Sequence, residues 1–143
     1  MSDLIVDASV AGKWFLPPQH EPFAFQAREV FNRFQQGQFE IVVPDLFWPE
    51  MANIFRKAVL QRRISRAEAR ASIGDLRSVR LAVVPTEPLA LEALRIALEH
   101  SVSSYDAFYV ALAAESQFPL LTADERLVSA LGARFPMRWL GSL

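Results

Sequence analysis

The chain contains no cysteine among its 143 residues. That absence excludes disulfide bonds, thiolate-bound zinc and a cysteine nucleophile, and it is compatible with a reducing cytosol. The five glycines form no phosphate-cradling motif, so the sequence does not favour nucleotide binding. There is no basic segment followed by a long apolar run, and no stretch of about 18 apolar residues. We therefore expect a soluble cytoplasmic protein without a secretory signal, a transmembrane helix or a membrane partner.

Acidic and basic residues nearly balance, with a formal net charge of −1, but they are unevenly distributed. Residues 56–80 hold eight basic and two acidic residues, so this basic arm carries +6, whereas seven basic and 14 acidic residues elsewhere give −7. A basic arm beside an acidic pocket suits an enzyme that acts on a polyanion. Arginines on solvated helix faces give the same pattern, so both interpretations stay open.

Apolar strands and amphipathic helices alternate along the chain, which favours an α/β sandwich built on a parallel sheet. The composition, 52% hydrophobic and 22% charged, allows a substantial core, and we expect a single domain over residues 1–143. Short apolar runs predict strands at 4–6, 39–43, 81–84, 120–122 and 137–140. Helical spacing and end signals predict helices at 8–15, 22–36, 46–61, 66–76, 88–100, 104–116 and 124–131. Ser65 and Glu68 form a capping box at the start of the fourth helix.

Four acidic residues, which we call the acidic quartet, lie where separate elements of this sheet would meet. Asp7 and Asp124 follow the strands 4–6 and 120–122, and Glu50 and Asp106 lie in the opening turns of two helices. Because ligands of parallel sheets bind beyond the carboxyl ends of the strands, these carboxylates should collect there and repel one another. A hard divalent cation with oxygen ligands relieves that repulsion. Such a site would suit metal-assisted hydrolysis of a phosphodiester.

Four segments around these acids, in this order along the chain, resemble the PIN-domain ribonucleases, and most closely the VapC-type toxins of toxin–antitoxin pairs. The segments are LIVDAS at 4–9, PEMAN at 49–53, SYDAFYVALA at 104–113 and LTADERL at 121–127. The resemblance implies a PIN-like three-layer α/β/α sandwich with a four- or five-stranded parallel sheet. It also implies Mg²⁺- or Mn²⁺-dependent endonuclease action on RNA, a homodimer, and an antitoxin partner whose C-terminal segment blocks the metal pocket.

Further residues match the pattern of this family. The hydroxyl that often follows the first aspartate corresponds to Ser9, and the hydroxyl before the last aspartate corresponds to Thr122. Asn53 occupies the usual place one helical turn after Glu50. Caps and turns explain Ser9, Asn53 and Thr122 nearly as well as a role in the site. The candidates for RNA contacts are Lys13, Arg62, Arg63 and Arg66.

The roles within the quartet follow from reach and position. Asp7, short and fixed at a strand end, is expected to bind metal directly, and so is Asp106, because a helix N-terminus favours a carboxylate. Asp124 would bind a second ion or hold metal-bound water, and Glu50, which has the longest reach, would orient the attacking water or bind through water. The number of ions, and the choice between Mg²⁺ and Mn²⁺, stay open.

Other functions fit the sequence less well. Each acid alone could be a turn former or a helix cap, so the non-enzymatic alternative is a PIN-like protein that binds RNA or acts as a scaffold. A phosphatase of the haloacid dehalogenase type would need an aspartate two residues after Asp7, where Ser9 stands. A receiver domain would need a late lysine, whereas Lys13 and Lys57 both lie in the first half of the chain.

Several other residues have more than one possible role. Lys13 either points toward phosphate or, as is usual for lysine, is solvated. His20 and His100 are expected at the surface and not as a metal pair. The apolar helices at 23–34 and 46–60 could supply the contacts to an antitoxin and to a second copy. Four aromatic residues either stack on bases or fill the core or a dimer face: Trp14, Phe15, Phe47 and Trp48.

Overall fold

A computed structural model describes residues 3–143 and contains a five-stranded parallel sheet with the strand order β3-β2-β1-β4-β5. The strands are β1 (Leu4–Val6), β2 (Ile41–Pro44), β3 (Ala82–Val84), β4 (Leu120–Thr122) and β5 (Met137–Trp139). Every neighbouring pair is parallel, and β1 lies at the centre with Val6 opposite Leu121 of β4. The parallel sheet predicted from the alternation of elements is therefore confirmed.

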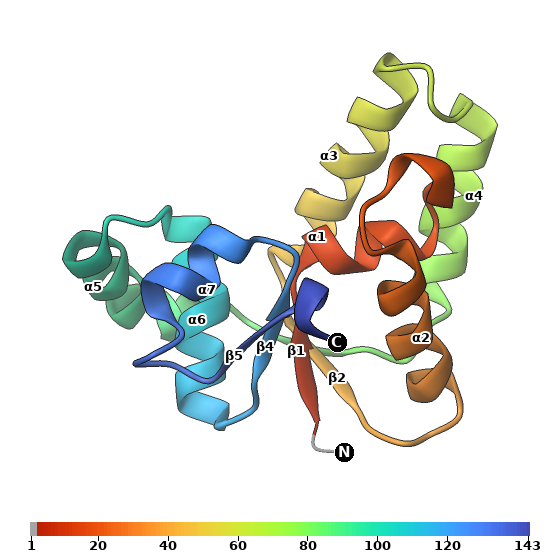
Figure 1. The fold of residues 1–143 in the computed structure, drawn as a ribbon. Coiled ribbons are helices and arrows are strands. Elements are labelled where there is room, and N and C mark those ends of the chain that lie inside the picture. The colour runs from red at the N-terminus through yellow and green to blue at the C-terminus, as the bar shows by residue number, and fades with distance from the viewer. Residues whose placement is uncertain (1–2) are drawn as a thin grey trace.

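Helices cover both faces of this sheet, which confirms the predicted three-layer fold. Figure 1 shows α1 to α4 on one side of the strands and α5 to α7 on the other. The helices are α1 (Ala8–Ala11), α2 (Ala24–Gln35), α3 (Phe47–Leu60), α4 (Arg66–Arg77), α5 (Ala90–His100), α6 (Ser104–Ser116) and α7 (Glu125–Leu131). Short 3-10 helices are η1 (Gly12–Trp14), η2 (Pro18–His20), η3 (Glu87–Leu89) and η4 (Leu140–Ser142). No helix within residues 3–143 is long and apolar enough to span a membrane.

The central strand β1 joins the two hydrophobic cores. Its three residues are fully buried, and their side chains alternate between faces, as the period of a strand requires. Leu4 and Val6 belong to the core under α1 to α4, and Ile5 belongs to the core under α5 to α7. The end of β1, and hence Asp7, is thereby fixed by packing on both sides.

Three predicted helices differ from those observed, and one of them, expected at 88–100, is divided into η3 and α5. The helix expected at 8–15 is divided into α1 and η1. The second of these begins at Gly12, where an added Cβ atom would lie only 3.1 Å from Cγ2 of Ile54 in α3. The helix expected from Pro22 begins two residues later, after Phe23 turns the chain with a left-handed backbone (φ 60°). The segment after β1 packs against α3, which supplies Glu50 and Asn53 to the site.

The aromatic residues that could have stacked on bases are mostly core residues. Trp14 and Phe47 are buried, so base stacking is wrong for both of them. The Trp14 indole donates to the carbonyl of Ala27 at 3.0 Å and stacks on Phe31 with ring centroids 4.4 Å apart. Phe15 and Trp48 are partly buried against the same core. The apolar side of α2 packs against this core as well, through Phe23, Ala27, Val30, Phe31 and Phe34. This side is therefore not free to contact an antitoxin or a second copy.

The basic arm forms the end of α3 and all of α4, which Figure 1 shows rising together beyond the sheet. The capping box is confirmed, since Ser65 Oγ accepts from the Glu68 N–H while the Glu68 carboxylate accepts from the Ser65 N–H. Before it, Arg62 adopts a left-handed backbone (φ 59°) and donates to the Val59 carbonyl, and Arg63 donates to Ala58. This C-terminal turn of α3 folds the chain back.

Candidate active site

All four acids of the quartet line one cavity of about 500 Å³ at the carboxyl edge of the sheet. Asp7 and Asp124 follow the paired strands β1 and β4, while Glu50 and Asp106 lie in the first turns of α3 and α6. The structure therefore brings together four residues that are spread from position 7 to position 124 of the chain. Their catalytic and metal-binding roles stay predictions.

Asp7 is the most firmly held acid of the four, and its side chain is buried. Its Oδ2 accepts hydrogen bonds from Thr122 Oγ1 at 2.9 Å and from Ser9 Oγ at 3.0 Å. The same two hydroxyl oxygens accept the backbone N–H groups of Asp124 and Ala123, at 3.1 and 3.2 Å. Ser9 and Thr122 therefore tie the end of β1 to the end of β4 and fix the rotation of the Asp7 carboxylate.

Burial raises the pKa of Asp7, and the charge of Asp106 raises it further, whereas the hydrogen bonds from Thr122 and Ser9 oppose the shift. The pKa of Asp106 is also raised, first by burial and then by the charge of Asp124. Asp106 is half-buried, and the N–H of this residue is capped by Ser103 Oγ at 3.1 Å. These shifts show that the carboxylates act on one another across the cavity.

Glu50 is held by Tyr109, a residue that the sequence analysis missed. The buried Tyr109 hydroxyl donates to Glu50 Oε1 at 2.7 Å. Burial and the charges of Asp7 and Asp106 outweigh this bond and raise the pKa of Glu50 to about 7. Asp106 and Tyr109 lie one turn apart on α6, so both are on one face of the helix. This spacing was the sequence signal that could have identified Tyr109 as a site residue.

Asp124 caps a helix and also lines the cavity, while its predicted metal-binding role stays a prediction. It is exposed, and its Oδ1 caps α7 by accepting the N–H groups of Arg126 and Leu127 at 3.0 and 3.3 Å. The capping interpretation is therefore correct, and the same side chain lines the cavity with its remaining oxygen unused by the cap. Asn53 also lines the cavity from an exposed position on α3.

The donor set fits a hard divalent cation. All four quartet side chains offer oxygen, and mutual repulsion among them would fall when a cation binds. Within residues 3–143, no group of three or more Asp, Glu or His side chains is arranged to hold an ion by itself. An ion here would therefore take one or two carboxylates and complete its shell with water, which is the usual habit of Mg²⁺. The histidines lie elsewhere, with His20 exposed and His100 half-buried against Phe135.

The four predicted RNA-contact residues are separated by the structure. Lys13 and Arg63 line the cavity, and both pair with Glu21, a carboxylate that the sequence analysis missed. Lys13 is buried, so the expectation of a solvated lysine is wrong. Arg62 is an exposed residue of the α3 turn, and Arg66 lines a different groove between α3 and α4.

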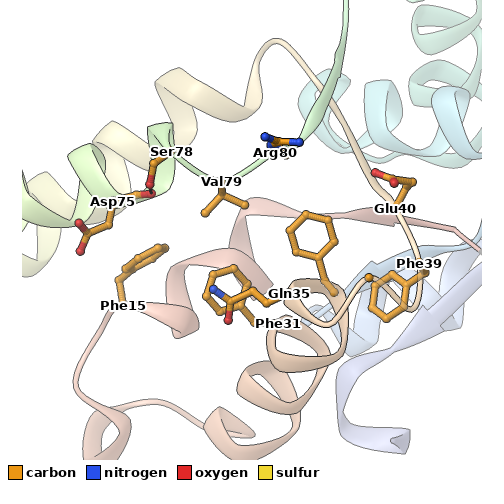
Figure 2. Close-up of a pocket in the computed structure, with 11 residues that line it drawn as sticks. Phe15, Phe31, Gln35, Phe39, Glu40, Asp75, Ser78, Val79 and Arg80 are labelled. Atoms are coloured by element: carbon orange, nitrogen blue, oxygen red, sulfur yellow. Dashed lines mark hydrogen bonds between the residues drawn. The ribbon is translucent and has the colours of Figure 1, made fainter.

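A larger cavity, of about 640 Å³, lies away from the quartet. Figure 2 shows Phe15, Phe31 and Phe39 on one side of it and the end of α4 with Asp75 and Arg80 on the other. None of the quartet lines this cavity, whose lining mixes four phenylalanines with polar side chains such as Gln35, Glu40 and Arg80. The smaller acidic cavity is therefore the one with the groups that phosphodiester chemistry requires.

Residues 4–131 match the PIN domain family, and the chain belongs to that family. Ribonuclease VapC1 of Mycobacterium tuberculosis is 40% identical over 89 residues, which are 62% of this chain and 66% of that protein. The chain thus matches just under two thirds of the length of that relative. Ribonuclease VapC3 of Pyrobaculum aerophilum is 30% identical over 132 residues, or 91% of this chain and 95% of that protein.

Solved structures share the fold across nearly the whole chain. The crystal structure of PAE2754 from Pyrobaculum aerophilum superimposes with a TM-score of 0.73 at 22% identity, covering 99% of this chain and 91% of that chain. A toxin–antitoxin complex from Klebsiella pneumoniae gives a TM-score of 0.59 at 14% identity, with 96% and 97% coverage. The resemblance to PIN-domain ribonucleases of the VapC type, first drawn from four short segments, is confirmed.

The raised pKa values predict how the stability of the metal-free protein depends on pH. Asp7, Glu50 and Asp106 bind protons more tightly in the folded state, so the free energy of unfolding should fall as pH rises through their folded pKa values. For Glu50 this window runs from 4.5 to about 7. Thermal melting in EDTA should show the decline, and Mg²⁺ should reverse it near neutral pH. A Glu50→Gln variant should flatten the upper part of the decline.

The contrary result would be a melting temperature that rises through this window. An equal decline in wild type and in Glu50→Gln would show that Glu50 does not contribute to it. Glu29→Gln, which removes an exposed carboxylate on α2, is the matched control and should keep the wild-type slope.

Proposed function

We propose that this chain is a single PIN domain that cleaves RNA as a divalent-metal-dependent endonuclease, acting in the cytoplasm as the toxin of a toxin–antitoxin pair. The observation that carries the proposal is the acidic quartet facing one cavity, with three of its pKa values raised by burial and mutual charge. The named ribonuclease relatives support the same activity.

Asp7 and Asp106 are the residues that we assign as direct metal ligands. Asp7 is fixed by two hydroxyls on Oδ2, which leaves Oδ1 for a ligand bond, and Asp106 lies in the first turn of α6, where the helix dipole favours a carboxylate. Asp124 and Glu50 would act through metal-bound water. A bound Mg²⁺ or Mn²⁺ would lower the pKa of a water and neutralise charge on the phosphate.

Glu50 is the residue placed to handle the proton of the attacking water. Its carboxylate lines the same cavity as Asp7 and Asp106, and the Tyr109 hydroxyl orients its Oε1, so it would accept a proton from a water in that cavity. Ser9 and Thr122 keep Asp7 in place through the two strand ends that they join. The protein thus contributes a rigid, partly water-excluding frame around the reacting phosphate.

The first test of this activity is cleavage of an RNA pool by wild type and by Asp106→Asn, each with Mg²⁺ or Mn²⁺ and with EDTA. Wild type should give discrete fragments only with metal, and the variant should lose roughly a hundredfold or more in rate. Asp75→Asn, on α4 and outside the cavity, should cleave like wild type.

Intact RNA in every lane, from protein that melts normally, would contradict the nuclease. Binding of RNA without cleavage, unchanged in Asp106→Asn, would instead support the non-catalytic RNA-binding alternative. Fragments that persist in EDTA would point to a contaminating metal-independent ribonuclease.

The groove between α3 and α4 is the surface that we assign to the antitoxin. It measures about 590 Å³ and has an apolar floor of residues from both helices, which are Ala52, Phe55, Val59, Leu60, Ala69 and Ile73. Arg56, Arg66 and Arg70 stand at its rim, so it fits an amphipathic segment with acidic flanks. Because α3 also carries Glu50, a segment in this groove could continue into the cavity and block it.

The groove assignment predicts that Ile73→Glu loses the antitoxin while keeping nuclease activity. The partner would be isolated by co-purification with tagged Asp106→Asn from the native host, and binding would be measured with the purified pair. Phe25→Glu introduces the same charge at an exposed apolar residue of α2 outside the groove and should bind normally. Undiminished binding by Ile73→Glu would place the antitoxin elsewhere.

An exposed leucine stripe on α5 is the surface that we assign to a homodimer. Leu91, Leu94 and Leu98 are 84%, 52% and 74% exposed, and Tyr105 at the start of α6 is 67% exposed. The spacing of the leucines places them along one side of the helix, so two copies could bury the same stripe against each other. Arg95 pairs with Glu92 and Glu99, which satisfies the charges beside the stripe within the same helix.

The stripe predicts that a Leu91→Glu, Leu98→Glu double variant is a monomer by light scattering, whereas wild type and Phe25→Glu are dimers. Burying two glutamates in an apolar interface is unfavourable, so the dissociation constant should rise by at least about a hundredfold. A variant that stays dimeric, or a wild type that is monomeric at all concentrations, would contradict the assignment.

A further inference from the structure

One wall of the acidic cavity carries two cations joined by a single carboxylate. Glu21 Oε1 lies 3.2 Å from Lys13 Nζ, and Glu21 Oε2 lies 2.8 Å from Arg63 Nη1. The side chains of Lys13, Glu21 and Arg63 are 8%, 13% and 24% exposed. We call these three residues the cation clamp, and all three line the same cavity as the quartet.

The backbone under Lys13 is held from both sides. Gly12 packs against Ile54 of α3, and Trp14 is anchored by its bond to Ala27. Arg28 of α2 donates to the carbonyls of Lys13 and Leu16, at 3.4 and 3.0 Å. The backbone of Lys13 is therefore held in place, and Glu21 holds the ammonium group at the end of its side chain.

Arg63 reaches Glu21 from the opposite direction. The left-handed Arg62 and the hydrogen bond from the Arg63 N–H to the Ala58 carbonyl reverse the chain at the end of α3. A non-glycine residue in this conformation is unfavourable, so the turn persists because its surroundings hold it. The clamp thus joins η1, the residue after η2 and the end of α3 at one point.

Stability alone does not explain the clamp. Removing ionic groups from water offsets most of the attraction between them, so a buried ion pair contributes little net stability. Two cations and one carboxylate leave a net positive group in the cavity that the negative quartet also lines. Each cation also retains donors beyond the one used by Glu21, since an ammonium has three and a guanidinium five.

We propose that Glu21 is a positioning residue that holds Lys13 and Arg63 as a phosphate-binding pair for the RNA beside the quartet. This inference rests on the proposed function, because the phosphate is that of the RNA substrate. The pair would bind a phosphate oxygen of the substrate while the quartet side holds the metal. Of the four cationic candidates, Lys13 and Arg63 would act at the cavity, and Arg62 and Arg66 would not.

The substitution Glu21→Gln separates this role from simple electrostatics by the sign of its effect. Removing a negative charge near a polyanion should by itself tighten RNA binding. If Glu21 positions the two cations, its loss should weaken binding, because the cations are no longer held toward the cavity. The pair Glu29 and Arg33, an exposed ion pair 3.3 Å apart on α2, provides matched controls for both charge changes.

The experiment measures dissociation constants for a short single-stranded RNA by fluorescence anisotropy across a salt series, with Mg²⁺, in the Asp106→Asn background. Lys13→Ala and Arg63→Ala should each lower the slope of log affinity against log salt by about 0.7, as expected for one lost phosphate contact. Glu21→Gln should weaken binding by about tenfold and also lower the slope. Glu29→Gln and Arg33→Ala should leave affinity within about twofold.

Equal or tighter binding by Glu21→Gln, with the full salt slope, would overturn the proposal, as would a wild-type slope in Arg63→Ala. Melting curves check that each variant folds. If Glu21→Gln does not fold, the partly exposed Arg63→Ala at a helix end decides the question by its slope. Wild-type cleavage measured in parallel tests the nuclease separately, because an inactive wild type with these binding losses would refute the proposed function and retain the phosphate site.

Discussion

The buried carboxylate of Asp7 is the constraint on which the rest of the site depends. It lies at the end of the central strand, where both cores fix the backbone, and two hydroxyls from two strands fix its rotation. Asp106, Glu50 and Asp124 are then brought near it by α6, α3 and β4. A buried acid beside other acids is unfavourable without a cation, so the metal-free fold keeps an electrostatic strain that metal binding would relieve.

The remaining architecture separates the surfaces that a regulated nuclease needs. Negative charge gathers at the carboxyl edge of the sheet, and the cation clamp lines the same cavity. The apolar groove lies between α3 and α4, while the leucine stripe lies on α5, in the opposite helical layer (Figure 1). One helix, α3, carries Glu50 and one side of the groove, and the turn at its end directs Arg63.

The sequence predicted the five strands, the helical layers and the meeting of the quartet, because strand and helix periodicities are local and parallel topology then determines which ends converge. Ser9 and Thr122 were also predictable, since both flank strand-end aspartates. The partners Glu21 and Tyr109 were not, because their contacts join residues far apart in sequence and depend on side-chain direction. Lys13 was misjudged for the same reason, since burial of a lysine requires a countercharge that local patterning does not reveal.

The measurement that tests the central claim most directly is the anomalous scattering of Mn²⁺ in crystals of the wild-type protein and of Asp7→Asn. A carboxylate site at the sheet edge predicts a peak in the cavity lined by the quartet in wild type, weakened or absent in the variant. A Mn²⁺ peak that is unchanged in Asp7→Asn, or that lies only outside this cavity, would contradict the account.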